Sequence, residues 1–336
     1  MKIAIVGVGA IGGFLGLRLA QSGQDVTAIA RGATAEALRR HGWRVDSGGI
    51  RHAFAAQVET DASQAGAQDV VIVAVKGPAM ASVAPMVEAM LRDDTAVVTA
   101  MNGLSWWFAH HLPALGASQP LESVDPGGHI IEAIPASQVV GCVVHMAASV
   151  SEPGVVRHAL GQRFIIGEAA GAPTPRLQRI AGALRGAGLD VEVSATIHRD
   201  IWYKLWGNMT MNPVSALTGA TMDRILDDPL VNRFCLDVMA EAAAVGARIG
   251  CRVEQSGEDR QKITRTLGAV RTSMLQDVDA GRPLEIDALL ASVREIGARV
   301  GIATPQLDAL TGLARLQART LGLYPAAPTD SERVVQ

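Results

Sequence analysis

The residues best suited to proton transfer in this sequence lie in one run, residues 201–213. Within it Lys204, Asn208 and Asn212 recur every four residues, so a helix would place one ammonium group and two carboxamides on the same face. Most positions around them are large and apolar. Polar groups on such a helix need partners, and a bound carboxylate or hydroxy acid would supply them. The same spacing also fits a polar stripe that faces solvent.

Two shorter polar segments follow, SMLQD at residues 273–277 and LEID at residues 284–287. Glu285 has two interpretations. It can belong to a site, or it can be an acid that the helix dipole favours in a first helical turn, because Pro283 is a plausible first helical residue. The pattern by itself does not choose between them.

A glycine-rich turn near the start of the chain predicts a dinucleotide site. Gly7 would permit a tight turn, Gly9 would let the backbone approach a pyrophosphate, and Gly12 would let the helix pack closely on the preceding strand. The pyrophosphate would then lie on the N–H groups of the helix N-terminus. The expected cofactor contacts here are Gly7, Val8, Gly9, Ala10, Ile11 and Gly12.

The nucleotide is predicted from the end of the second strand. An NAD site usually has an acid there, about 20 residues after the glycines, for the ribose 2′-hydroxyl. This chain has Arg31 instead. A guanidinium suits bidentate contact with a 2′-phosphate, so we expect NADP, although a solvated loop arginine is the simpler alternative. Bound there, such a cofactor supplies a hydride to a ketone, and an ammonium group can stabilise and protonate the oxygen.

The sequence pattern differs between the two halves of the chain. The first half alternates nearly unbroken Val, Ile, Ala and Thr runs with helical stretches, which predicts a doubly wound parallel sheet. A further β-rich stretch spans residues 139–167, with Pro153-Gly154 as a turn. The expected strands are 2–6, 25–30, 69–75 and 95–100, and the expected helices between them are 11–21, 33–41 and 78–91.

After about residue 197 the strand-like runs give way to helical patterns. The fold class is therefore α/β, an N-terminal Rossmann domain at 1–196 with a C-terminal all-helical domain at 197–325. A flexible tail is expected at 326–336. The expected helices are 199–217, 229–249, 255–280, 283–300 and 305–321.

Bulk composition narrows the function classes. The chain has 336 residues, 49% hydrophobic and 19% charged, with a net charge of −3 and no dense basic run, so nothing favours nucleic acid or a membrane surface as partner. Three scattered cysteines predict neither a disulfide framework nor a metal site. No charge-free apolar run reaches about 18 residues. We expect a cytoplasmic protein without a membrane span, for which a homodimer is left open.

Taken together, these residues resemble the ketopantoate reductases (2-dehydropantoate 2-reductases) over nearly the whole chain. The resemblance rests on the Gly7–Gly12 turn, Arg31, Val75-Lys76, Asn102-Gly103, Lys204 with Asn208 and Asn212-Pro213, SMLQD at 273–277 and EID at 285–287.

The resemblance implies NADPH-dependent reduction of 2-dehydropantoate to (R)-pantoate, as in pantothenate and coenzyme A biosynthesis. It makes Lys204 the general acid and Glu285 its assistant. It places Asn102, Asn208, Asn212 and Ser273 around the substrate, and Lys76 and Asn102 near the nicotinamide.

Two departures bear on the substrate. After Asn102 the chain continues with Trp106, Trp107 and Phe108 in a stretch longer than the family pattern. These aromatics could line a wider or more apolar pocket, or they could anchor the insertion on the surface or at a dimer contact. Val270 stands where the pattern has an Asn. The alternatives are therefore a paralogue that reduces a bulkier 2-oxo acid and, more remotely, a non-catalytic NADP sensor.

Overall fold

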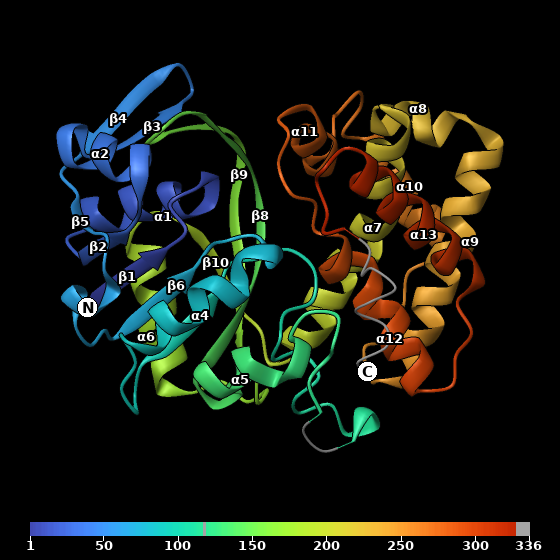
Figure 1. Ribbon diagram of the computed structural model, residues 1–336, viewed down its shortest axis with the longest axis horizontal. Helices are drawn as coiled ribbons and strands as arrows, with labels where there is room; N and C mark the ends of the chain where they lie inside the picture. Colours follow the sequence, from blue (N-terminus) through green and yellow to red (C-terminus); the bar gives the residue numbers. More distant parts are fainter. Residues whose placement is uncertain (117–118, 327–336) are drawn as a thin grey trace. The chain divides into compact units, whose positions relative to one another are not determined.

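The computed structural model describes residues 1–116 and 119–326. It consists of two compact units. Unit 1 comprises Met1–Leu112 and Gly116–Ile201, and unit 2 comprises Pro113–Leu115 and the chain from Trp202 onward. The chain is coloured from blue in unit 1 to red in unit 2 (Figure 1). The tail expected at 326–336 lies, beyond Ala326, outside the described residues.

Unit 1 is built on a ten-stranded sheet with the order β4-β3-β9-β8-β7-β6-β1-β2-β5, in which β10 also pairs with β9. The centre of the sheet is parallel, because each neighbouring pair in the order β7-β6-β1-β2 runs in the same direction. The strands are β1 Lys2–Val6, β2 Asp25–Ile29, β3 Trp43–Ser47, β4 Ile50–Phe54, β5 Gln57–Glu59, β6 Val70–Val73, β7 Ala96–Thr99, β8 Val139–Glu152, β9 Val155–Glu168 and β10 Asp190–Val193.

Helices cover both faces of this sheet, which confirms the predicted doubly wound class. One core contains buried residues of α1, α2 and α6, and the other contains those of α3, α4 and α5. The helices are α1 Ala10–Gln21, α2 Gly32–His41, α3 Ala62–Ala65, α4 Met80–Glu88, α5 His129–Ala133 and α6 Pro175–Gly186, with short 3-10 turns η1 Gly77–Ala79, η2 Pro113–Leu115, η3 Pro126–Gly128 and η4 Ala136–Gln138.

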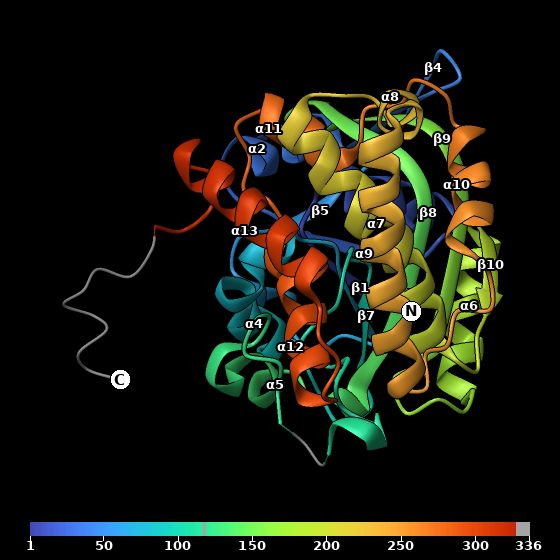
Figure 2. The same cartoon turned by 90° about the vertical axis from the view of Figure 1, so that its right-hand side faces the viewer.

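Unit 2 is helical throughout its described part, as predicted. Its first helix, α7, begins at the end of unit 1, and α9 packs against α8, α10, α12 and α13 (Figure 2). The helices are α7 Ile197–Thr218, α8 Met222–Asp227, α9 Pro229–Arg248, α10 Gly257–Arg265, α11 Ser273–Asp279, α12 Ser292–Arg299 and α13 Pro305–Thr320, and a π-helical stretch, η5, spans Asp287–Ala291.

Two of the expected helices are wrong in extent. Residues 255–280 form α10 and α11 rather than one helix, because Gly268 takes a φ of 71° and Thr272 caps a new helix by accepting the Leu275 N–H at 3.2 Å. The helix expected at 283–300 begins only at Ile286. Pro283 is therefore not its first residue, and Glu285 lies before the first turn rather than in it.

None of the helices in the described ranges combines the length and the apolar character that a membrane crossing requires.

Candidate active site

The carboxyl ends of four adjacent parallel strands gather the predicted cofactor residues. Val6 of β1 lies opposite Ile29 of β2 and Val73 of β6, and Val73 lies opposite Thr99 of β7. Because these strands run parallel and in register, the loops that follow them leave the sheet at one edge. In open α/β sheets ligands bind at this edge, where the strand order reverses. It brings together the glycine turn, Arg31, Lys76 and Asn102.

The glycine turn has the geometry that a pyrophosphate cradle requires. Gly7 has a φ of 92°, and a Cβ there would lie 2.8 Å from the Ala74 carbonyl carbon. A Cβ on Gly12 would lie 2.2 Å from the Gly7 carbonyl oxygen, so the helix packs directly on the turn. At Gly9 a Cβ would meet no atom within 4 Å, so this backbone borders open space. The backbone of this turn is therefore tightly packed toward the sheet and open at Gly9, as the binding of a dinucleotide pyrophosphate requires.

Three side chains follow the same edge. Arg31 is exposed and precedes α2 directly after β2. Lys76 is half-buried after β6, at the cap of η1. Asn102 is half-buried in the bend after β7, next to Gly103, whose φ is 73°. A guanidinium, an ammonium and a carboxamide at one sheet edge can hold phosphate, ribose and carboxamide groups.

The polar face predicted in residues 201–213 is present on α7. Lys204 and Asn208 are half-buried, and Asn212 is buried. Successive helical residues rotate by about 100°, so Trp202 and Trp206 lie about 160–200° around the helix from Lys204.

Those two tryptophans hold α7 against α9. The Trp206 indole N–H donates to the Met239 carbonyl at 2.7 Å. Trp202 lies so close to Gly246 that a Cβ there would be 2.3 Å from the indole nitrogen. The packing face and the polar face of α7 are therefore opposite, and the solvated-stripe alternative does not account for the buried Asn212.

Ser273 and Glu285 lie on two further elements of unit 2. Ser273 is exposed and begins α11. Glu285 is half-buried, and its carbonyl accepts the Leu289 N–H at 3.2 Å, so its backbone begins the helical hydrogen bonding of η5. Val270 is 39% exposed, and its carbonyl accepts the Met222 N–H.

The aromatic insertion belongs to the core of unit 1. Trp106, Trp107 and Phe108 are at most 1% exposed. The Trp106 indole donates to the Ile134 carbonyl at 3.1 Å, and the Trp107 indole donates to Thr99 Oγ1 at 3.2 Å. Because both indole donors are bonded within the core, these aromatics pack inside unit 1, and the structure favours neither a pocket lining nor an anchor at the surface.

No sequence pattern pointed to His198, which lies in the first turn of α7. Its ring centroid lies 5.3 Å from that of Trp107 and 5.1 Å from that of Phe108. Burial lowers the pKa of His198 to about 4, so the ring is neutral at pH 7. A histidine among aromatic residues more than 80 positions earlier leaves no local pattern by which it could be recognised.

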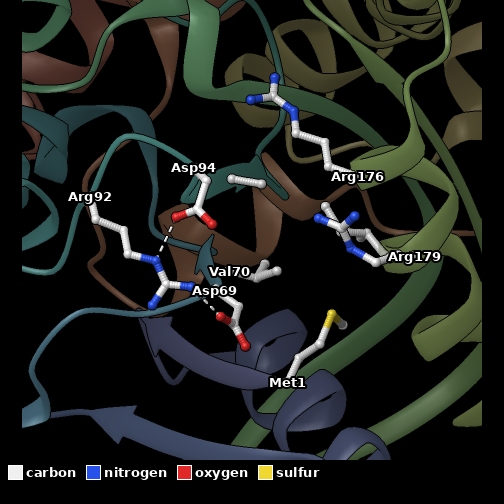
Figure 3. A pocket seen from close by; sticks show the side chains of 9 residues that line it. Met1, Asp69, Val70, Arg92, Asp94, Arg176 and Arg179 are labelled. Carbon is white, nitrogen blue, oxygen red and sulfur yellow. Dashed lines mark hydrogen bonds and ion pairs between the residues drawn. The ribbon is translucent and has the colours of Figure 1, made fainter.

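The opposite, amino edge of the sheet carries a cavity of about 170 Å³ (Figure 3). Arg92 bridges Asp69 and Asp94 there, donating to Asp94 at 2.5 Å, while Arg176 and Arg179 line the other side. The Lys2 N–H and the Arg92 guanidinium lower the pKa of Asp69. This pocket holds none of the predicted site residues. Within the described ranges no group of three or more His, Cys, Asp or Glu residues could hold a metal ion.

The fold and the glycine turn place the chain in the dinucleotide-binding Rossmann class, with a helical second unit. Comparison with known proteins gives the family. The ketopantoate reductase PanE/ApbA model matches residues 3–171, and the model of that family's C-terminal part matches residues 196–318. The chain belongs to the ketopantoate reductase family.

Comparison with individual relatives supports this family assignment. A 2-dehydropantoate 2-reductase of Mesorhizobium japonicum is 39% identical, covering 96% of this chain and all of its own. A crystallised ketopantoate reductase candidate from Ralstonia solanacearum MolK2 is 56% identical, with a TM-score of 0.93 over 96% of this chain and 99% of that one. A D-mandelate dehydrogenase complex with NADH and anilino(oxo)acetate is 22% identical, with a TM-score of 0.82 over 96% and 100% of the two chains, which shows the fold alone.

Proposed function

We propose that this protein reduces 2-dehydropantoate to (R)-pantoate with NADPH, the reduction of pantothenate biosynthesis. The observation that carries the proposal is the polar face of α7, where Lys204 and Asn208 lie opposite Trp206, which packs on α9, and the buried Asn212 continues the polar face one turn later. The Mesorhizobium relative bears the name of this activity.

The cofactor half of the proposal rests on the loops at the carboxyl edge of the sheet. The N–H groups at the start of α1 would hold the pyrophosphate, because the open backbone at Gly9 lets it approach. Arg31 would hold the 2′-phosphate, and Lys76 and Asn102 would lie toward the nicotinamide end. Bound in this way, the cofactor supplies a hydride to the substrate carbonyl.

The substrate half rests on unit 2. Lys204 donates a proton to the carbonyl oxygen as negative charge develops there, and the half-burial of this ammonium strengthens the interaction. Glu285 assists Lys204. Asn208, Asn212 and Ser273 hold the carboxylate and hydroxyl of the substrate through their amide and hydroxyl groups, and Asn102 of unit 1 is the one proposed substrate contact outside unit 2.

A panel of 2-oxo acids tests the substrate assignment. Steady-state kcat/KM with NADPH is measured for 2-dehydropantoate, 2-oxoisovalerate and a larger aromatic 2-oxo acid. We expect 2-dehydropantoate to exceed the others by at least about tenfold, because a site built to bond a substrate hydroxyl rejects analogues without one. A higher value for the bulkier acid would replace the proposal with the paralogue alternative, and no turnover with any acid would favour the sensor alternative.

A further inference from the structure

The segment after α13 is bonded to the chain on both sides of Glu285. The Leu284 N–H donates to the Leu323 carbonyl at 3.1 Å. Three residues later the Asp287 carboxylate accepts the Tyr324 hydroxyl at 2.6 Å. Glu285 therefore lies inside a closed loop of contacts, which we call the C-terminal clamp: Leu284 with Leu323, and Asp287 with Tyr324.

The end of α13 fixes one side of this clamp. Gly322 takes a φ of 69°, and the Leu323 N–H donates to the Ala318 carbonyl at 2.7 Å, so the segment turns back onto its own helix. The Arg319 guanidinium carbon lies 5.4 Å from the centroid of the Tyr324 ring, and its Nε donates to the Pro325 carbonyl at 3.1 Å. The hydroxyl of Tyr324 is thereby held in a defined place.

Burial makes the bond between Tyr324 and Asp287 hard to replace. Burial raises the pKa of the Asp287 carboxyl, while the Tyr324 hydroxyl and the Arg315 and Arg319 charges act against that rise. Burial, followed by the bond to Asp287, raises the pKa of Tyr324 to about 12, so the phenol keeps the proton that it donates. A half-buried carboxylate deprived of this donor would have to find another or move.

The other side of the clamp is rigid but irregular. Leu284 is 2% exposed and Ile286 is fully buried, so apolar packing holds both neighbours of Glu285. Directly after them the helix widens into η5, where the Ser292 N–H donates to the Asp287 carbonyl in the π pattern. Single π-helical turns inside α-helices occur frequently at functional sites. The backbone of Glu285 is thus set by contacts that the carboxylate itself does not make.

We propose that Tyr324 and Asp287 are positioning residues. The C-terminal clamp orients the carboxylate of Glu285 for its role beside Lys204. This inference rests on the proposed function, which gives Glu285 its role beside Lys204. Neither Tyr324 nor Asp287 touches the substrate in this account. They act through the backbone of residues 284–287.

The test changes the two side chains of the clamp one at a time. Tyr324→Phe deletes the hydroxyl alone, and we expect kcat to fall about five- to thirtyfold, since a 1 Å misplacement of a reacting group costs up to about a hundredfold. The Kd for NADPH should stay near its wild-type value, whereas the Tm should fall modestly because the Asp287 carboxylate loses its donor. Asp287→Asn keeps an acceptor for the phenol and should retain nearly full kcat, whereas Asp287→Ala should behave like Tyr324→Phe.

A matched control removes a hydroxyl from the same region without touching the clamp. Thr320 donates to the Leu316 carbonyl inside α13 at 3.0 Å, so Thr320→Val should leave kcat unchanged. A Tyr324→Phe variant that melts earlier but turns over at the normal rate would make the clamp a merely structural contact and overturn the proposal.

A Glu285→Gln background separates the clamp from the function it serves. If Tyr324 acts through Glu285, then Tyr324→Phe should lower kcat no further in this background. A further fall equal to that in the wild type would overturn the clamp. Full turnover by Glu285→Gln alone would instead remove Glu285 from the proposed function, which is a different result from full turnover by Tyr324→Phe alone.

Discussion

At the scale of single residues, the proposal that the exposed Arg31 selects NADPH over NADH can be tested directly. Arg31→Ala should lower the preference for NADPH over NADH by about ten- to a hundredfold, because a charge-assisted contact to a phosphate is worth about 1.5–3 kcal/mol. The ratio of kcat/KM for the two cofactors measures this. Arg39→Ala, at an exposed arginine of α2, the helix that Arg31 precedes, is the control and should leave the ratio unchanged. Equal use of both cofactors by the wild type would contradict the assignment.

A separate prediction concerns Lys204, for which we propose a role toward the substrate and not toward the nucleotide. Lys204→Ala should cut kcat by at least about a hundredfold, the usual scale for a general acid, while the Kd for NADPH stays close to normal. Lys262→Ala controls for the loss of a positive charge from unit 2, because the Lys262 side chain is 76% exposed and pairs with Asp259. Unchanged turnover in Lys204→Ala would mean that another group donates the proton.

Residue patterns were sufficient to predict the glycine turn but not the contacts of the C-terminal clamp. The turn from Gly7 to Gly12 has a local signature, because each glycine meets a steric demand of the neighbouring chain. Glu285 was recognised only with the help of the family resemblance. Its supports Leu323 and Tyr324 come almost forty residues later, and their contacts depend on how α13 folds back, which no local spacing encodes.

At the scale of elements, continuous apolar runs predicted the central strands because those strands are buried on both faces. The strand β4 was not predicted, because all five of its residues are exposed and no alternation of apolar and polar residues marks it. The expected helix over 255–280 ran through Gly268, whose positive φ breaks the helix in the structure. Burial and backbone geometry, rather than propensity, decided both cases.

The aromatic insertion leads to a prediction at this same scale. Trp107→Phe should destabilise unit 1 by about 1–3 kcal/mol, because it removes buried volume and the bond to Thr99. The ratio of kcat/KM for 2-dehydropantoate to that for a larger aromatic 2-oxo acid should stay constant. Trp43→Phe, at an equally buried tryptophan of the other core, is the control. A shift of that ratio specific to Trp107→Phe would restore the pocket-lining alternative.

At the scale of the whole molecule, the acid stability of the fold depends on His198. Its pKa is lowered by burial to about 4 from 6.5, so above pH 6.5 the ring is neutral in both the folded and the unfolded chain. As the pH falls from 6.5 to about 4, His198 binds a proton in the unfolded chain but not in the folded chain. Folding stability is therefore lost across this window, by about 2 kcal/mol at pH 5.

Comparison of the wild type with His198→Gln isolates this contribution. Gln does not titrate, so the difference in unfolding free energy between pH 7.5 and pH 5 should be about 2 kcal/mol smaller in the variant. Buried carboxyls such as Asp200, whose pKa burial raises, act in the opposite sense but are common to both proteins and cancel. Urea unfolding followed by tryptophan fluorescence gives the two free energies. An identical pH dependence in both proteins would show that His198 is solvated or protonated in the fold, against its packing on Trp107 and Phe108.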